Sequence, residues 1–484
     1  MAKPNEQQYG GATKLRKVSL VVALSFLTLL AWIVSKRFDL RTVETAGADK
    51  SVWTTAQSCR LVLASLTGNQ PIDAEIARLQ KQALNETGRP AALERLGWIF
   101  VRKARTTFDP GFYKLAEQSA TCMEANGSSG ADALLLRAHA LQSLHRFSEA
   151  EATARELVKV RERPFDYGVL GDVLIDEGKI REGAAAYQMM VDLRPDLQSY
   201  VRAAYVRWLT GDVDGAIQLM RLAVTSSSPN DPESGAWAFT RLALYQLQRS
   251  ATNQGLVSCD AALSLQKDYA PALMARGRIL LTLNRPADAV SDLRRAAELN
   301  PLPEYLWALA DALRAAGDLG AAKNIESQII ERGAAEDPRS FSLYLATHSE
   351  QLDRAVELAE RELANRQDIF THDALAWALA AAGRPTEAQV HTKQALSEGT
   401  RDARLYFHAG VIAALSGETA QARQWLQQAA PMRDTLLPSE QAQFEAWRAK
   451  ILSPEWNSNG GKAARQLVPV PGPTETGSSR KVLS

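Results

Sequence analysis

Hydrophobic residues recur along most of the chain at the three- and four-residue spacing of an α-helix, as Tyr167, Leu170 and Leu174 illustrate. No stretch alternates between hydrophobic and polar residues as a half-buried β-strand does. The pattern therefore predicts an all-α protein. One segment differs from the rest, because residues 18–34 read VSLVVALSFLTLLAWIV without a charge.

The helical pattern repeats with a period of 33 or 34 residues, apart from one copy of 39 residues. Pairs of positions twelve residues apart carry Ala or Gly at seventeen of eighteen places. The first members of these pairs are Ala138, Gly171, Ala204, Ala243, Gly277, Ala310, Leu343, Ala376 and Gly410. Small side chains allow two antiparallel helices to approach closely. In five copies a glycine follows the first small residue after seven positions, where it can end a helix in the left-handed conformation. Each unit is therefore predicted to be a helix-turn-helix hairpin.

This unit resembles the tetratricopeptide repeat (TPR). The copy over residues 164–195 resembles it most closely, with Tyr167, Leu170, Gly171, Tyr187 and Pro195 in register. The copies depart from the family pattern in two ways: the tryptophan at the fourth position is missing from all of them, and few keep the terminal proline. Longer segments of the sequence resemble an uncharacterised bacterial TPR family. The resemblance implies a right-handed α-solenoid in which the first helix of each hairpin lines a concave groove.

The pattern divides the chain into segments. Nine TPR-like repeats are predicted over 131–434, after an irregular N-terminal helical repeat over 71–130. A helix over 435–452 is expected to cap the last hydrophobic face, because solenoid ends need a polar cover. The residues over 453–484 are rich in Gly, Pro, Ser and Thr, and we expect them to be disordered.

The uncharged segment predicts a single transmembrane helix over 18–35, between a polar tail over 1–17 and a juxtamembrane segment over 36–70. The alternative is a cleaved signal peptide, but the nearest small-x-small site lies about a dozen residues past the apolar core. Four basic residues precede the segment and three follow it, which favours a cytoplasmic N-terminus. The repeats are then expected on the periplasmic or extracytoplasmic side of a bacterial membrane.

Composition and motifs argue against several classes of function. A formal net charge of +1 does not give the chain the overall positive potential that attracts nucleic acid. The six histidines form no HExxH motif, the glycines form no phosphate-binding loop, and the three cysteines lack metal-ligand spacing. We therefore expect no enzyme activity, cofactor or metal. Cys122 and Cys259 are expected to be small core residues, whereas Cys59 is a candidate for cross-linking two copies.

The resemblance places positions 2, 5, 9 and 12 of each copy on the groove, counting Ala131 as position 1. Many of these positions are aromatic or charged. The candidate partner-binding residues are Phe165, Tyr205, Trp208, Trp237, Arg278, Trp307, Asp311, Arg314, Tyr344, Phe370, Asp373, Trp377 and Phe407. Large aromatic side chains are typical anchors of protein interfaces.

These observations predict a membrane-anchored scaffold or adaptor that binds a protein or peptide in an aromatic-lined groove. Two alternatives remain open at this stage. One is an accessory or sensor subunit for an envelope polymer or its biosynthetic machinery, with a glycan or lipid ligand. The other is a structural homo-oligomer.

Overall fold

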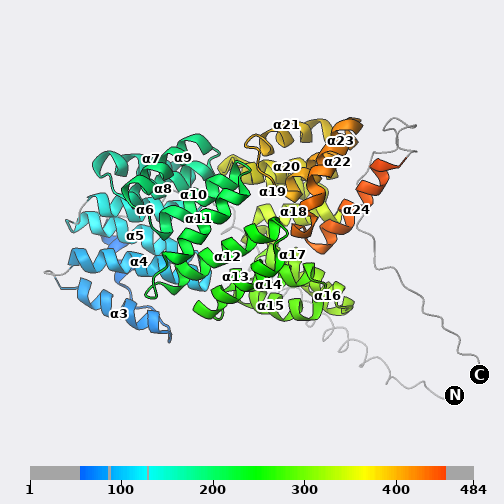
Figure 1. Cartoon of the computed structure of the whole chain (residues 1–484). Helices are drawn as coiled ribbons and strands as arrows, with labels where there is room; N and C mark the ends of the chain where they lie inside the picture. Colours follow the sequence, from blue (N-terminus) through cyan, green and yellow to red (C-terminus); the bar gives the residue numbers. More distant parts are fainter. Residues whose placement is uncertain (1–54, 86–88, 128–129, 454–484) are drawn as a thin grey trace, which may run out of the picture. The chain divides into compact units, whose positions relative to one another are not determined.

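The computed structural model describes residues 55–85, 89–127 and 130–453 (Figure 1). The chain divides into a first unit, Met1–Gln57, and a second unit, Ser58–Ser484. Only the last three residues of the first unit are described. Everything below concerns the second unit, whose described residues are helical and contain no strand.

Helices follow one another along the chain with short connections. Before the repeats lie α2 (Thr55–Leu63), α3 (Pro71–Ala83), α4 (Arg89–Thr107) and α5 (Gly111–Ala125). The first hairpins are α6 (Gly130–Ser143) and α7 (Phe147–Val160), α8 (Pro164–Asp176) and α9 (Ile180–Leu193), α10 (Leu197–Leu209) and α11 (Val213–Thr225), and α12 (Pro232–Gln248) and α13 (Thr252–Leu265).

Five further hairpins complete the series, which ends in a 3-10 helix and a last α-helix. They are α14 (Ala270–Thr282) and α15 (Pro286–Leu299), α16 (Pro303–Ala315) and α17 (Leu319–Glu336), α18 (Pro338–His348) and α19 (Leu352–Asn365), α20 (Ile369–Ala381) and α21 (Pro385–Ala395), and α22 (Ala403–Leu415) and α23 (Thr419–Ala429). Helices η2 (Ala430–Thr435) and α24 (Pro438–Leu452) follow. The predicted all-α solenoid of hairpins is confirmed.

The two helices of a hairpin meet at the paired small residues. A side-chain Cβ placed on Gly171 would lie 3.2 Å from the carbonyl oxygen of Gly183 and 2.3 Å from the ring of Tyr187. The corresponding Ala138 and Ala150 are fully buried. Larger side chains at these positions would push the helices apart, so the Ala/Gly spacing sets the hairpin geometry.

The turn of each hairpin contains a residue with positive φ. Gly178, Gly211, Gly317, Gly383 and Gly417 take φ between 74° and 87°. Where the repeat lacks this glycine, the turn residue is His145, Ser250, Asn284 or Ser349, which take the same left-handed conformation with φ of 55° to 58°. Because a Cβ destabilises this conformation, these four turns hold backbone strain that the glycine turns do not.

Distant parts of the second unit also touch. The Arg366 guanidinium lies 2.6 Å from the Asp176 carboxylate, 190 residues away in sequence. Beside this ion pair, a Cβ on Gly178 would lie 2.4 Å from the carbonyl oxygen of Gln367, so the two backbones are in close contact.

The same contact continues along the neighbouring repeats. The Thr400 hydroxyl donates to the carbonyl of Leu209, and the Gln248 side chain donates to the carbonyl of Arg401. The Trp208 and Phe370 rings stack 5.7 Å apart. We call this contact between α8–α12 and the connections that precede α20, α22 and α24 the seam. Through the seam, the later hairpins contact the earlier ones.

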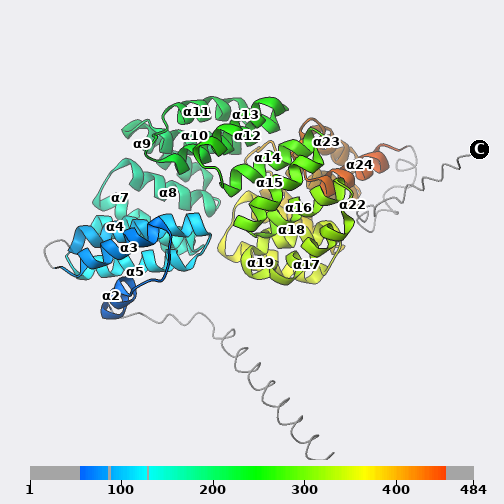
Figure 2. The same ribbon diagram turned by 90° about the horizontal axis from the view of Figure 1, so that it is seen from below.

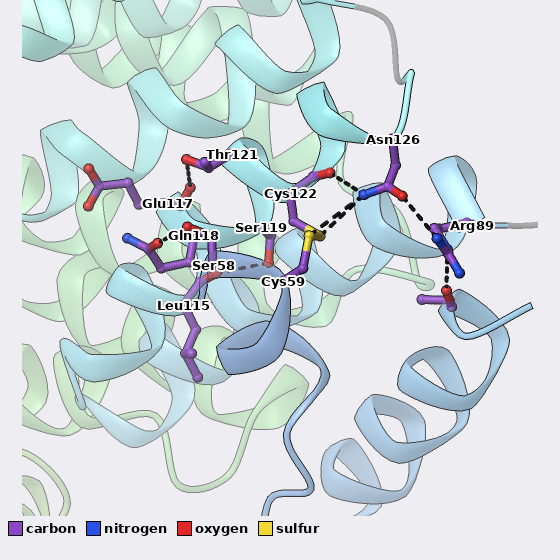
Figure 3. Close-up of a disulfide and its surroundings, with 11 residues drawn as sticks. Ser58, Cys59, Arg89, Leu115, Glu117, Gln118, Ser119, Thr121, Cys122 and Asn126 are labelled. Atoms are coloured by element: carbon purple, nitrogen blue, oxygen red, sulfur yellow. Dashed lines mark hydrogen bonds between the residues drawn. A yellow bond between two sulfur atoms is a disulfide. The ribbon is translucent and has the colours of Figure 1, made fainter. Parts of the chain in front are cut away.

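A disulfide joins α2 to α5. Cys59 and Cys122 are bonded, and the Asn126 side chain donates to the Cys122 carbonyl beside them at 2.8 Å (Figure 3). Cys122 is buried in the core as predicted, but it is bonded to Cys59, so the expectation that Cys59 cross-links two copies is wrong. The sequence reasoning missed the pair because the two cysteines lie 63 residues apart, on helices whose contact is not periodic. Cys259 is a buried free thiol, as predicted.

No described helix is long and apolar enough to cross a membrane. The predicted transmembrane helix over 18–35 and the predicted disordered tail over 453–484 fall outside the described residues, apart from Ser453.

We expect Ser250→Gly to stabilise the fold by about 1 kcal/mol, because glycine removes the cost of a Cβ in the left-handed conformation. The matched variant is Gly317→Ala, where a Cβ would meet no atom within 4 Å and only the backbone conformation is tested. It should lose a similar amount. Urea unfolding of both variants measures these changes, and a neutral result for Gly317→Ala would contradict the strain argument.

Candidate binding surfaces

The predicted groove residues fall into two groups. In the later repeats, Trp307, Tyr344, Trp377 and Phe407 are at most 2% exposed, so none of them offers a free ring. In the earlier repeats, Phe165 and Tyr205 are half-buried and Trp237 is 39% exposed, while Trp208 is buried in the seam. No partner is present to test whether any of them binds one, so their binding role stays a prediction.

Helix α24 lies beside α16, α22 and α23 (Figure 2), and it contacts two rings of the later group, Trp307 and Phe407. The first turn of α24 is held from α16: the Asp311 carboxylate accepts the backbone N–H and the hydroxyl of Ser439, at 2.9 and 2.6 Å. Trp307 donates its indole N–H to the same hydroxyl at 2.9 Å. Two side chains at predicted groove positions therefore bind the chain's own last helix.

Further along α24, charged and aromatic contacts continue. Arg404 binds both carboxylate oxygens of Glu440, at 2.6 and 3.1 Å. The Gln443 amide donates to the carbonyl of Thr347 at 2.6 Å, and Phe444 packs edge-on against Phe407 at 5.8 Å. We call the set Trp307, Asp311, Thr347, Arg404 and Phe407 the α24 surface.

Burial changes the ionisation of this surface. Asp311 is 2% exposed, and desolvation raises its pKa to about 6 although the bonds from Ser439 oppose the shift. The pKa of Glu440 is lowered because the attraction of Arg404 and its hydrogen bonds outweigh desolvation. Two carboxylates thus hold the first turn of α24. The pKa of Asp311 is raised by burial, whereas the pKa of Glu440 is lowered by Arg404.

The remaining predicted residues have other neighbours. Arg314 forms an ion pair with Glu326. Arg278, on α14, donates to the carbonyl of Thr435 in η2. Asp373 lies 2.9 Å from Nδ1 of His408. The described residues contain no group of three His, Cys, Asp or Glu side chains able to hold a metal.

The earlier group forms a second surface on α4, α6, α8, α10 and α12. The ring centres of Trp98, His139 and Phe165 form a triangle: Trp98 lies 6.1 Å from Phe165, and His139 lies 5.6 Å from Trp98 and 6.5 Å from Phe165. Arg105 lies 3.1 Å from Nε2 of His139. Burial and the nearby Arg105 and Arg202 lower the pKa of His139 to about 3, so it is neutral and accepts the bond from Arg105.

Two arginines complete this surface. Arg202 pairs with Asp172 at 2.6 Å and lies over the Phe165 ring. Arg241 lies 5.1 to 6.0 Å from the ring centres of Tyr205, Trp208 and Tyr245, as a cation–π contact requires. We call the set Trp98, Arg105, His139, Phe165, Arg202, Tyr205, Trp237 and Arg241 the aromatic–arginine face.

Sequence reasoning missed both arginines because it sampled positions 2, 5, 9 and 12 of each copy. Arg202 and Arg241 both occupy position 6, in consecutive copies. An arginine recurring at one position of neighbouring repeats was the available signal. Nothing comparable marked α24 as an occupant of the groove, because its contacts join residues about 130 positions apart.

Comparison with known proteins agrees with the hairpin geometry. Residues 169–232, 274–338 and 374–435 match the family model of the tetratricopeptide repeat. These three segments of the chain therefore resemble tetratricopeptide repeats. No curated protein matches the chain in sequence.

Several solved structures resemble the chain at low sequence identity. A tetratricopeptide repeat protein from Parabacteroides merdae is 16% identical, with a TM-score of 0.31 over 53% of this chain and 99% of that one. The type IV pilus biogenesis factor PilW is 12% identical, with a TM-score of 0.37 over 42% and 93%. A human IFIT1 dimer with PPP-AAAA is 13% identical, with a TM-score of 0.44 over 78% and 94%.

Asp311→Asn is expected to flatten the pH dependence of stability. Because burial raises the folded-state pKa of Asp311 from 3.8 to about 6, the folded protein binds a proton first as the pH falls. Between pH 7 and pH 5 this uptake should stabilise the wild type by about 1 kcal/mol, a gain the asparagine variant lacks. Urea unfolding at the two pH values measures the difference. Glu331→Gln, at an exposed position on α17, is the control. If the free energy of unfolding changed equally with pH in the wild type and in Asp311→Asn, the argument would be contradicted.

Proposed function

We propose that the chain is a non-enzymatic scaffold that binds a segment of a partner protein on the aromatic–arginine face. One observation carries this proposal. Neither Arg105 nor Arg241 forms an ion pair with a carboxylate of the described residues, although both lie beside aromatic rings. Arginines elsewhere in the repeats are commonly paired, for example Arg276 with Asp292 at 2.6 Å.

The chemistry of this face defines the partner segment. A guanidinium binds carboxylates through two parallel hydrogen bonds, and rings supply apolar contact. Trp237 lies four positions before Arg241 on α12, so the two project from one side of the helix. The face is suited to a peptide in which acidic and apolar residues lie close together. A glycan would use the rings but would not need the unpaired arginines.

Peptide binding tests this assignment. An array of acidic–apolar peptides, each matched by a version with Asn and Gln in place of Asp and Glu, is probed with the full chain. We expect the acidic peptides to bind, and Trp237→Ala with Arg241→Gln to weaken binding by about tenfold or more. The control is Arg221→Gln with Leu222→Ala, two exposed positions on α11.

Equal binding by the control and the Trp237/Arg241 variant would move the site elsewhere. Binding to a glycan array that the Trp237/Arg241 variant loses would favour the envelope-polymer alternative. A concentration-dependent mass in light scattering, with no peptide bound, would favour the homo-oligomer.

We further propose that residues 18–35 anchor the chain in a bacterial membrane and that the repeats lie outside the cytoplasm. The uncharged sequence supports the anchor. The Cys59–Cys122 disulfide supports the compartment, because disulfides persist in oxidising environments and are rare in the cytosol. Anchoring would raise the effective concentration of a bound partner at the membrane.

Thiol labelling of the protein taken directly from cells into denaturant tests the compartment. Under denaturing, non-reducing conditions we expect a maleimide reagent to label Cys259 alone, and reduction to make Cys59 and Cys122 available as well. A Cys259→Ser variant should therefore take no label without reduction. Label on all three cysteines before reduction would place the repeats in a reducing compartment.

A further inference from the structure

Helix α24 is packed differently from the hairpin helices. It follows the last hairpin, yet it contacts α16 as well as α22 and α23, and Gln443 reaches the carbonyl of Thr347 on α18. It therefore packs on the hairpin before it and also reaches the first helices of two earlier repeats, α16 and α18, as a bound helical peptide would.

One face of α24 makes these contacts. Phe444, Trp447 and Ile451 are fully buried, and they follow one another at the three- and four-residue spacing of a single helical face. Ser439 and Glu440 add polar recognition at the first turn, through Asp311, Trp307 and Arg404. Recognition therefore depends on side-chain identity as well as on apolar area.

Some buried polar atoms of α24 and of the helices that it contacts lack a hydrogen-bond partner among the described residues. Oε1 of Gln443 is buried without a hydrogen-bond partner in the described part of the chain, and so is Nε2 of His408. Nε2 of His348 is in the same condition. An unmade hydrogen bond in a buried site costs stability, so a helix that supplied the missing partners would bind this surface better than α24 does.

Helix α24 belongs to none of the nine hairpins. The extended and buried residues Leu436 and Leu437 link it to η2, while the paired helices of each hairpin pack on each other through the Ala/Gly crossings. Withdrawing α24 would uncover the α24 surface without removing a helix from any hairpin.

We propose that the α24 surface is a binding site for an amphipathic helix of a partner protein, and that α24 is the internal occupant that this helix displaces. The partner helix begins with Ser-Glu or a close equivalent and carries two aromatic residues about one turn apart, as Phe444 and Trp447 are. This surface is separate from the aromatic–arginine face, and the inference does not depend on the function proposed for that face.

The probe is a fluorescein-labelled peptide with the sequence of residues 437–453, added to the full chain. Phe444→Ala with Glu440→Gln weakens the internal helix, so we expect this variant to bind the peptide at least tenfold more tightly than the wild type does. A chain with Glu445→Gln and Arg448→Ala, which changes the outer side of α24, is the control and should bind the peptide as the wild type does.

Charge reversal tests the register of binding. A peptide with Glu440→Lys should bind the weakened chain at least tenfold less tightly, because Arg404 would then face a cation. Adding Arg404→Glu to the weakened chain should restore binding of that peptide. Equal binding of both peptides to the weakened chain would overturn the assigned surface.

Hydrogen exchange of the wild type provides a test that does not depend on how the variants fold. The amides of α24 should exchange at least tenfold faster than those of α22, because α24 opens while the hairpins stay closed. Equal protection of α24 and α22 would overturn the proposal, and so would a folded weakened chain that binds no peptide. Both outcomes leave the proposed role of Trp237 and Arg241 untouched.

Discussion

The close crossing of two helices within each hairpin is the constraint on which the rest of the structure depends. Alanine or glycine at both sides of the crossing lets the helix backbones approach, as at Gly171 and Gly183. Because the crossing recurs every 33 or 34 residues, each hairpin presents its first helix to the same side of the stack. That repetition aligns Trp307 and Arg404 toward α24, and it places Phe165 and Tyr205 on the aromatic–arginine face.

The sequence was sufficient for the fold because its signal is local and repeated. A small residue, a second one twelve positions later and a turn glycine between them describe a hairpin without reference to distant residues. The turn also keeps its backbone conformation in copies that lack the glycine, because His145, Ser250 and Asn284 adopt the left-handed conformation there.

The site could be predicted only in part, because its decisive contacts are not periodic. The repeat register placed Trp307 and Asp311 on the groove side, but it gave no reason for Ser439 to occupy them from 128 residues away. The disulfide illustrates the same point. Cys59 and Cys122 carry no shared motif, and only the packing of α2 on α5 brings them together.

The seam has a mechanical consequence. In an open solenoid each repeat touches only its neighbours, so the array can unravel from one end while the other end stays folded. Here the ion pair of Arg366 with Asp176 and the bond from Gln248 to Arg401 connect early repeats to late ones. Pulling on one end would therefore load both halves together, so the molecule should resist stretching as a closed ring does and not extend like a spring.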